Sequence, residues 1–477
     1  MPNKYKILVQ RADRLGDLVL ALPVIESIKK TYPHYEIDLL TSPIGKELVT
    51  DHSLINKVKV IDLSLKGRAW FDSYKKHIED IKKEKYNLYL SLWNNPWLAY
   101  LGWLARIGLR IGDSSNLSLK WLYNVPVFQD WEDYTRHQIE FNLDLLRPLQ
   151  IENPEIISKI YLNPKAEKDV QTYAKKMLDP NRKTIFILVS TGGTNYAFPQ
   201  KVLLDFIDLI EKTRKFNVIL GGKLEDEKSE LFKFQSDYVR NIINETSVTE
   251  LMSFINLADY YIGPDTGPTH IANFLNKPVV FYSPLKPNPP SRWGPVNEYQ
   301  QIIREEYHCS HLKAGQCHKD ECFKYLDSQY LYENFMDLVN RVGLLKSLSP
   351  GEQTQNRLLH SFRILYFAKN TKDYLNVKEI IEELRERGLK IFIFYTRNKP
   401  FLLSLPKIMR LVRKWNINIL QGRLPDWLVS FVRFYLGTIN QYIKPVYIPV
   451  PIHKYINFKE LISLYKEAFK GQRQQSI

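Results

Sequence analysis

Two short glycine-containing segments, about 250 residues apart, carry the side chains best suited to chemistry. The first segment, residues 10–17, follows an apolar run and contains Arg11, Asp13, Arg14 and Asp17. An aspartate at such a place can accept the proton of an attacking hydroxyl, and arginines can hold an anionic acceptor through paired hydrogen bonds. An N-cap role for Asp17 and plain solvation of the two arginines are the alternatives that the sequence leaves open.

The second segment, residues 263–270, also follows an apolar run and is expected to open a helix. Backbone N–H groups at a helix N-terminus, together with the hydroxyl of Thr266 and the small Gly267, suit a diphosphate. His270 is expected on the first helical turn, facing the same site. The alternative interpretation is an N-cap turn followed by a buried histidine.

Two further loops could approach a phosphate or a ribose. Residues 190–195 contain the pair Gly192-Gly193 after an expected strand, and two glycines let the backbone come close to an anion. Residues 221–225 end in Glu225, which could accept hydrogen bonds from a ribose or a base. A solvated helix start is the equally good alternative for Glu225.

The elements needed to position these loops are strands that alternate with helices. Such alternation predicts parallel sheets with helices on both faces and ligands at the carboxyl ends of the strands. We therefore predict an α/β protein with two Rossmann-like domains facing a cleft. The expected boundaries are 1–163 for an acceptor domain, 164–346 for a donor domain, and 357–477 for a basic α/β extension.

The apolar periodicity predicts individual elements in each part. Strands are expected at 6–9, 36–41, 57–61, 88–92, 184–189, 217–220, 242–244, 258–262, 278–282, 363–367 and 390–395. Helices are expected at 17–31, 70–83, 96–107, 137–149, 166–177, 200–213, 226–234, 248–256, 269–275 and 377–387.

The charge of the chain is unevenly placed. The net charge is +15 over 477 residues, yet residues 351–477 hold 22 Lys and Arg against nine Asp and Glu. This asymmetry favours an anionic partner, and membrane contact through Trp415, Trp427, Phe431 and Phe434 is one interpretation. A third small domain with these aromatics in its core is the other. A nucleic-acid partner is not expected, because no motif for it accompanies the charge.

Several classes of protein are disfavoured by composition. The sequence contains no run of about 18 apolar residues, so no transmembrane helix is expected. A strand is expected so near the N-terminus that it leaves no room for a signal peptide. A cytoplasmic protein is expected, peripheral on the inner membrane face if the basic region contacts lipid. Cys309, Cys317 and Cys322 fit no zinc spacing and are interpreted as simple thiols, so no metal is expected.

Residues 5 to about 345 resemble glycosyltransferase family nine, the heptosyltransferases of lipopolysaccharide core assembly. The matching segments are residues 7–23, 110–112, 137–149, 221–225 and 247–284. The resemblance implies a GT-B architecture and an inverting, metal-independent transfer that needs no cofactor. It implies a nucleotide-diphosphate sugar, with ADP-heptose as candidate donor, and a lipid-linked saccharide as acceptor.

The resemblance also implies roles for single residues. The family's proposed base falls on Asp17, and Asp13 is a second candidate. Tyr196 stands where relatives carry a donor-binding lysine, which keeps open a catalytically silent relative that binds a saccharide or nucleotide as an assembly partner. The family's donor contacts fall on Thr191, Gly192, Glu225, Thr246, Asp265, Thr266, Gly267 and His270.

Overall fold

The structure is a computed structural model that divides the chain into two compact units, Met1–Val342 and Gly343–Ile477. In the second unit it describes residues 343–347 and the backbone of four strands. In the first unit the described residues are 5–131, 133, 136–151, 154–157, 159–191, 196–226, 228–283, 289–297, 299–303 and 326–342.

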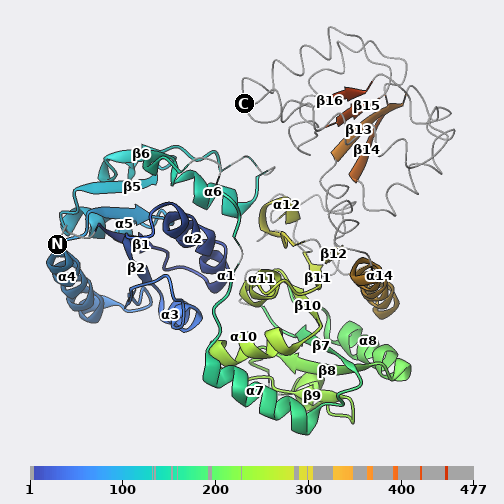
Figure 1. The fold of residues 1–477 in the computed structure, drawn as a ribbon. Coiled ribbons are helices and arrows are strands. Elements are labelled where there is room, and N and C mark those ends of the chain that lie inside the picture. The colour runs from blue at the N-terminus through green and yellow to red at the C-terminus, as the bar shows by residue number, and fades with distance from the viewer. Residues whose placement is uncertain are drawn as a thin grey trace. The chain divides into compact units, whose positions relative to one another are not determined.

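The first unit begins with a six-stranded parallel sheet in the order β3-β2-β1-β4-β5-β6 (Figure 1). The strand order reverses direction between β1 and β4, and ligands of such sheets bind in the crevice at this switch point. The short strand β6 had no prediction, and β5 was indicated only by the family resemblance at residues 110–112. The strands are β1 (Lys6–Gln10), β2 (Glu36–Thr41), β3 (Lys57–Val60), β4 (Leu88–Ser91), β5 (Leu109–Asp113) and β6 (Val125–Val127).

Helices cover both faces of this sheet because alternate strand residues point to opposite sides. Ile7 and Val9 belong to the core beneath α1, α2 and α6, whereas Leu8 belongs to a separate core beneath α4 and α5. The helices are α1 (Leu15–Val19), α2 (Leu22–Thr31), α3 (Pro43–Val49), α4 (Gly67–Glu84), α5 (Pro96–Leu104) and α6 (Gln138–Asp144), with 3₁₀ turns η1 (Lys120–Leu122) and η2 (Arg147–Leu149).

The single helix predicted for 17–31 is wrong, because two helices occupy this stretch. Pro23 is the second residue of α2, has no N–H to donate, and crowds the turn before it. Helix α1 ends in a 3₁₀-type turn, in which the Ala21 N–H donates to the Leu18 carbonyl. Helix α2 then begins at Leu22. Helix 137–149 is likewise shorter than predicted, since α6 ends before Pro148 and only a 3₁₀ turn follows.

A second six-stranded parallel sheet follows in the order β12-β11-β10-β7-β8-β9, with its own switch point between β10 and β7. The strand predicted at 242–244 is wrong: the strand ends at Asn241, and Ile242 and Ile243 are buried in the turn beyond it. The strands are β7 (Lys183–Leu188), β8 (Phe216–Gly221), β9 (Val239–Asn241), β10 (Tyr260–Pro264), β11 (Val279–Tyr282) and β12 (Gln300–Ile303).

The predicted helix bounds 200–213 are confirmed. The helix predicted at 226–234 is wrong in length: only Glu230–Lys233 is helical, because the Asp226 carboxylate accepts from the Lys228 N–H and forms a turn ahead of it. The helix predicted to start at Thr269 begins two residues earlier, since Thr266 is its N-cap and Pro268 lies in its first turn. The helices are α7 (Pro164–Met177), α8 (Gln200–Thr213), α9 (Glu230–Lys233), α10 (Val248–Leu257), α11 (Gly267–Phe274), α12 (Pro290–Trp293) and α14 (Ser328–Ser347).

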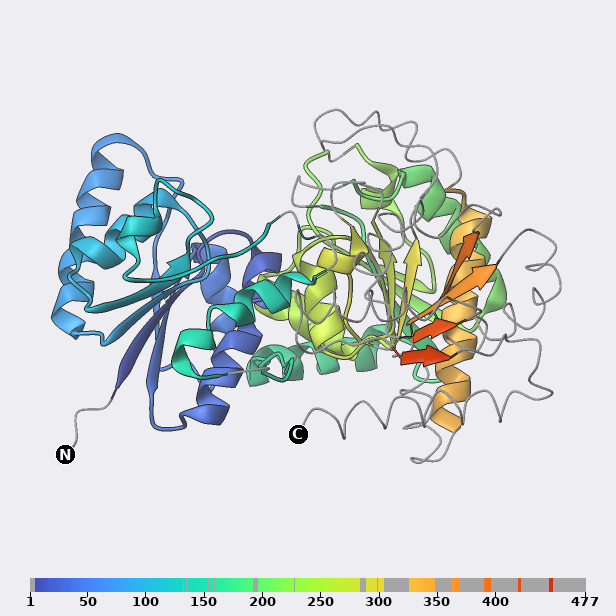
Figure 2. The ribbon, with the colours of Figure 1, turned by 90° about the horizontal axis from the view of Figure 1, so that it is seen from above.

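Helices lie between the two sheets of the first unit, and one hydrophobic core joins both domains there (Figure 2). Val19 and Ile25 from the first domain share this core with Ile255 and Ile271 from the second. Helix α1 packs against α11. The predicted pair of Rossmann-like α/β domains is therefore confirmed.

The second unit contains a parallel four-stranded sheet in the order β14-β13-β15-β16. The strands predicted at 363–367 and 390–395 are present, whereas the helix predicted at 377–387 and the aromatic residues 415, 427, 431 and 434 lie outside the described residues. Among the described residues, no helix combines the length and the apolar character needed to span a membrane. The strands are β13 (Arg363–Ala368), β14 (Lys390–Tyr395), β15 (Ile419–Gln421) and β16 (Val446–Ile448).

Candidate active site

A cavity of about 490 Å³ lies beyond the carboxyl ends of β1 and β4, at the switch point of the first sheet. Its wall combines carboxylates, amides and tryptophans, which is the mixture that binds sugar hydroxyls and the apolar faces of sugar rings. The lining residues are Arg11, Asp13, Arg14, Asp17, Leu92, Trp93, Asn94, Asp113, Ser115, Gln129, Trp131, Gln138 and Trp293.

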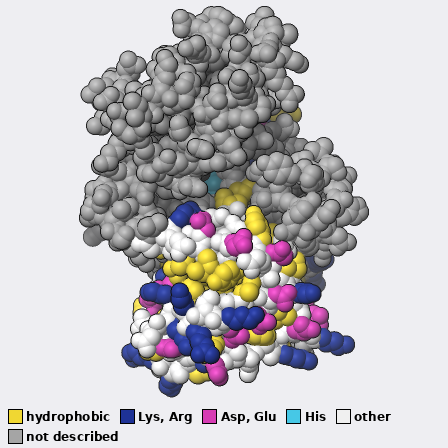
Figure 3. All heavy atoms as spheres, turned by 90° about the vertical axis from the view of Figure 1, so that its right-hand side faces the viewer, with side chains coloured by type: hydrophobic (Ala, Val, Ile, Leu, Met, Phe, Trp, Pro, Cys, Tyr) yellow, Lys and Arg dark blue, Asp and Glu magenta, His cyan; other side chains and the backbone are white. Residues whose placement is uncertain are grey.

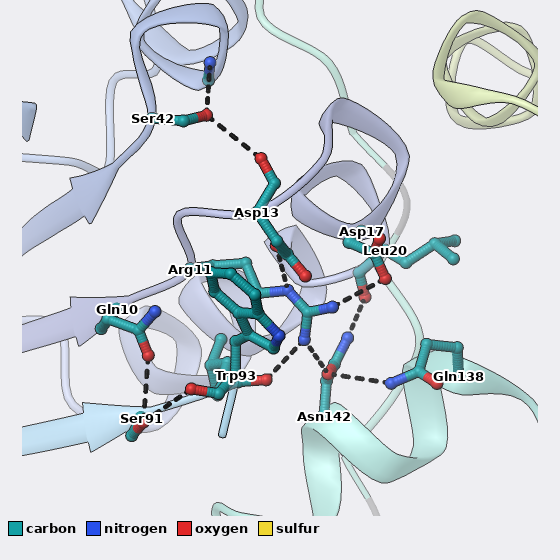
Figure 4. Close-up of polar contacts among 12 residues, drawn as sticks. Gln10, Arg11, Asp13, Asp17, Leu20, Ser42, Ser91, Trp93, Gln138 and Asn142 are labelled. Carbon is teal, nitrogen blue, oxygen red and sulfur yellow. Dashed lines mark hydrogen bonds and ion pairs between the residues drawn. The ribbon is translucent and has the colours of Figure 1, made fainter. Parts of the chain in front are cut away.

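Arg11 is the centre of the polar network at the floor of this cavity (Figure 4). Its Nε donates to Asp13 Oδ1 at 2.8 Å, and its Nη2 donates to Asp17 Oδ1 at 2.7 Å. Nη1 donates to the Leu92 carbonyl and, at 3.4 Å, to Asn142 Oδ1. Among the described contacts, one of the two N–H groups of Nη2 has no acceptor. The guanidinium therefore holds both candidate bases in place, while its predicted role as an acceptor ligand rests on that one remaining N–H.

Asp13 and Asp17 differ in their surroundings. Burial raises the pKa of Asp13 to about 6; the guanidinium of Arg11 opposes this shift and the nearby charge of Asp17 adds to it. Asp17 is the third residue of α1, whose N-cap is Arg14, so the N-cap interpretation of Asp17 is wrong. Arg14 itself is exposed at the cavity.

One wall of the cavity is organised by Asp113, which is 4% exposed. Its Oδ2 accepts from Trp131 Nε1 at 2.7 Å and from Ser115 Oγ at 2.5 Å. Trp131 stacks on Phe141 with ring centroids 5.3 Å apart. The indole is thus fixed in orientation at the cavity wall. Asp113 was not predicted from the sequence, although a carboxylate at the carboxyl end of a parallel strand is a signal for a site residue.

The second domain supplies another part of the wall through α12. The Arg292 guanidinium carbon lies 4.2 Å from the centroid of Phe141 and 4.9 Å from that of Trp131. Its Nη2 donates to Gln138 Oε1 at 3.2 Å, and its neighbour Trp293 lines the cavity. No motif in the sequence indicated this arrangement, because the partners are more than 150 residues apart.

Helices α1 and α11 meet at two glycines, and this contact brings the two predicted segments together. A Cβ atom on Gly16 would lie 3.2 Å from the Gly267 Cα and 3.0 Å from His270 Cδ2. A Cβ atom on Gly267 would lie 3.0 Å from the Gly16 nitrogen. The candidate base segment therefore abuts the N-terminus of the helix that carries the predicted donor loop.

The donor loop itself is largely buried, with Asp265 6% and His270 3% exposed. Burial, followed by the charge of His137, lowers the pKa of His270 to about 3, so its ring is neutral at physiological pH. His270 Nε2 lies 3.7 Å from Asp265 Oδ1, which is too long for a hydrogen bond. His270 could thus donate or accept one hydrogen bond at this site but does not add positive charge.

The remaining predicted donor residues lie at the same edge of the second sheet. Thr191 follows β7, and the exposed Glu225 follows β8. Thr246 precedes α10, in a loop joined to the Glu225 loop by the bond from the Leu224 N–H to Asn244 Oδ1 at 2.9 Å. Tyr196 is half-buried ahead of α8. Gly192 and the three cysteines lie outside the described residues.

The described part of the chain contains no cluster of three His, Cys, Asp or Glu side chains arranged to hold a metal ion. The polar groups that line the cavity are the paired carboxylates, the Arg14 cation and the hydrogen-bonding wall.

Comparison with known proteins identifies the family. The model of glycosyltransferase family 9 (heptosyltransferase) matches residues 74–322, just over half of the chain. Lipopolysaccharide heptosyltransferase 1 of Campylobacter coli is 28% identical, over 58% of this chain and 82% of its own length.

Solved structures agree on the fold. A family 9 glycosyltransferase from Veillonella parvula matches with a TM-score of 0.60 and 17% identity, over 72% of this chain and 99% of that one. The ADP-heptose heptosyltransferase II of Escherichia coli matches with a TM-score of 0.58 and 18% identity, over 71% and 99%. The GT-B fold is therefore confirmed, and the chain belongs to glycosyltransferase family 9, the heptosyltransferases.

Proposed function

We propose that this glycosyltransferase transfers a heptose from ADP-heptose to a saccharide of a lipid-linked lipopolysaccharide core, with inversion and without a metal ion. The observation that carries the proposal is the Asp13–Arg11–Asp17 group at a cavity. The segment that bears this group contains Gly16, which abuts Gly267 at the N-terminus of α11. The donor and acceptor classes are supported by the names of the relatives, which include lipopolysaccharide heptosyltransferases and an ADP-heptose enzyme.

In this mechanism Asp17 is the general base. The acceptor hydroxyl oxygen attacks the anomeric carbon of the donor from the face opposite the diphosphate, and its proton passes to the Asp17 carboxylate. The bond from the anomeric carbon to the diphosphate oxygen breaks, and the nucleoside diphosphate leaves. We prefer Asp17 to Asp13 because Asp17 directly follows Gly16, the residue that abuts Gly267 of the predicted donor loop.

The leaving diphosphate needs positive electrostatic potential. The N-terminus of α11, with backbone N–H groups near Thr266 and Gly267, offers it through the helix dipole. Because His270 is neutral, we assign this role to the exposed Arg14 at the cavity, in place of the acceptor-binding role that the sequence predicted for it. Thr191, Glu225 and Thr246 are proposed to hold the nucleoside, together with Gly192.

A panel of ADP-, GDP- and UDP-sugars assayed with a chelator tests the donor and the metal independence together. Transfer from ADP-heptose at an unchanged rate in the chelator is expected, and NMR of the product should show the inverted anomeric configuration. Retained configuration, or full loss of activity in the chelator with recovery on adding a divalent ion, would overturn the mechanism.

A silent relative that binds saccharide or nucleotide is the second candidate, and Tyr196 is the observation that favours it. The test compares the wild type with Tyr196→Lys in the same panel. If the wild type binds nucleotide in calorimetry but transfers no sugar, and Tyr196→Lys gains transfer, the silent interpretation is correct.

We also propose that the protein works on the inner face of the cytoplasmic membrane, with the basic region 357–477 in contact with anionic lipid. The support is its excess of Lys and Arg over Asp and Glu. Vesicle flotation at rising salt is the test, and binding that is the same at low and high salt would contradict it.

A further inference from the structure

The outer side of the first domain carries a row of exposed aromatic side chains along α5 and its neighbours α4 and η1. Trp97, Trp103 and Trp121 are 53%, 44% and 54% exposed, and Phe71 on α4 is 65% exposed. We call these four residues the aromatic face. Large aromatic side chains gathered on one surface usually mark an interaction site, because leaving them in water is unfavourable.

Ring contacts hold the three tryptophans of the aromatic face in a fixed arrangement. Trp97 packs edge-on against Trp70 and Tyr74, with ring centroids 5.8 and 5.6 Å apart. Trp121 packs in the same manner against Tyr100 and Trp103, each at 5.8 Å. The face is therefore a preformed surface built on packed elements.

Helix α5 explains why these rings are exposed. Its nine residues, Pro-Trp-Leu-Ala-Tyr-Leu-Gly-Trp-Leu, contain no charged side chain. Leu98 and Leu101 are buried beneath the helix against Leu8 and Tyr89 of the sheet. A helix that is apolar on every side is typical of one covered on both sides, yet the outer side of α5 is open.

The charges around the aromatic face are mostly positive. Among residues 64–76 and 96–122, the exposed ionic side chains comprise six cations and one carboxylate, that of Asp72, whose partner is Arg68 at 3.7 Å. The face of the second domain shown in Figure 3, by contrast, mixes both signs. Exposed tryptophans surrounded by cations suit the interfacial region of an anionic bilayer. The cations are Lys66, Arg68, Lys75, Lys76, Arg106 and Lys120.

We propose that the aromatic face docks the first domain on an anionic lipid bilayer, independently of the basic C-terminal region. The Trp97 end of the face adjoins the cavity, because Trp93 and Asn94 line the cavity and α5 begins two residues later, with Trp97 as its second residue. Docking here would bring the cavity close to the membrane surface. The link to a lipid-linked acceptor rests on the proposed function, whereas the docking itself does not.

The test is co-sedimentation of the full chain with vesicles of phosphatidylglycerol and phosphatidylethanolamine, with neutral phosphatidylcholine vesicles alongside. Two variants probe the apolar and ionic parts: Trp103→Gln/Trp121→Gln and Lys66→Glu/Arg68→Glu. Each is expected to lower the partition coefficient at least about tenfold. The second variant changes only exposed side chains, so it tests the proposal even if the first folds poorly.

Matched controls lie on the second domain: Tyr330→Gln removes an exposed aromatic residue of α14, and Lys175→Glu/Lys176→Glu reverses two exposed charges of α7. The controls should bind like the wild type. Equal binding by variants and wild type, or equal losses in variants and controls, overturns the proposal. A changed oligomeric state in light scattering with unchanged vesicle binding also overturns it, since the face would then be a protein interface.

The vesicle-binding and light-scattering measurements need neither donor nor acceptor, so they can be interpreted even if the proposed function fails.

A separate transfer assay uses a delipidated, water-soluble acceptor, and transfer to it should be unaffected by both variants. A loss of that transfer in the variants would mean that the face acts in catalysis, which also overturns the docking proposal.

Discussion

Gly16 of α1 and Gly267 of α11 pack backbone against backbone, and a Cβ atom on either would lie 3.0 to 3.2 Å from main-chain atoms of the other. Neither position leaves space for a side chain while the helices remain in contact. Because Asp17 follows one glycine and Thr266 precedes the other, the distance between the candidate base and the donor loop depends on this contact.

Gly16→Ala should therefore separate α1 from α11 and misplace the base relative to the donor. We expect kcat/KM to fall at least about tenfold and the free energy of unfolding to drop by about 1–3 kcal/mol. Gly108→Ala is the control, because a Cβ atom there meets nothing within 4 Å. Wild-type activity in Gly16→Ala would show that the contact does not set the geometry of the site.

Asp17→Asn should remove the base and keep the volume of the side chain. We expect kcat to fall about 10²–10⁴-fold while nucleotide affinity, measured by calorimetry, stays within about twofold. Arg11 still bonds Asp13 in this variant, so the fold should be retained. If Asp17→Asn transfers sugar at the wild-type rate, Asp17 is not the base.

The raised pKa of Asp13 predicts that the folding stability depends on pH. Its folded pKa of about 6 lies above the ordinary 3.8, so the native state holds the proton more tightly than the unfolded chain does. The stability that this proton contributes is complete below about pH 4 and is lost as the pH rises to about 6, by an amount on the order of 3 kcal/mol.

Asp13→Asn should abolish this part of the stability profile in denaturation experiments between pH 4 and 7. If ionised Asp13 assists Asp17, the wild-type kcat should also rise through an apparent pKa near 6, and Asp13→Asn should remove that step. A wild-type stability that is flat from pH 4 to 6 would contradict the assignment.

Arg292 should act on the acceptor side although it belongs to the second domain. Arg292→Met removes the bonds to Gln138 and the cation above Phe141 and Trp131, so the wall loses its support. We expect the acceptor KM to rise about tenfold with donor KM unchanged, and Arg292→Lys to be intermediate because it lacks the planar group. Equal effects on both KM values would indicate general destabilisation instead.

The sequence predicted well those strand and helix bounds that depend on neighbouring residues alone. The strand at 36–41 and the helix at 200–213 have the bounds that their apolar spacing predicts, and the two glycine loops follow strands as expected. Errors arose where one residue changes the backbone, as at Pro23, or where a short apolar pair such as Ile242-Ile243 fills a buried turn.

The candidate site was predictable only in part. Arg11, Asp13, Arg14 and Asp17 are found together at the cavity because they are neighbours in sequence. Their network with Asn142, and the wall that joins Asp113 to Trp131 and Arg292, depend on how distant segments pack. Apolar spacing and loop motifs carry no information about such pairings.

The placement of α12 has a consequence for engineering this enzyme. Trp293 belongs to the second domain, to which we assign the nucleotide sugar, yet it lines the cavity of the first domain. A hybrid made by joining the first half of one relative to the second half of another would inherit a mismatched wall. Exchanging residues 289–297 together with residues 1–163 should transplant acceptor preference as an intact module.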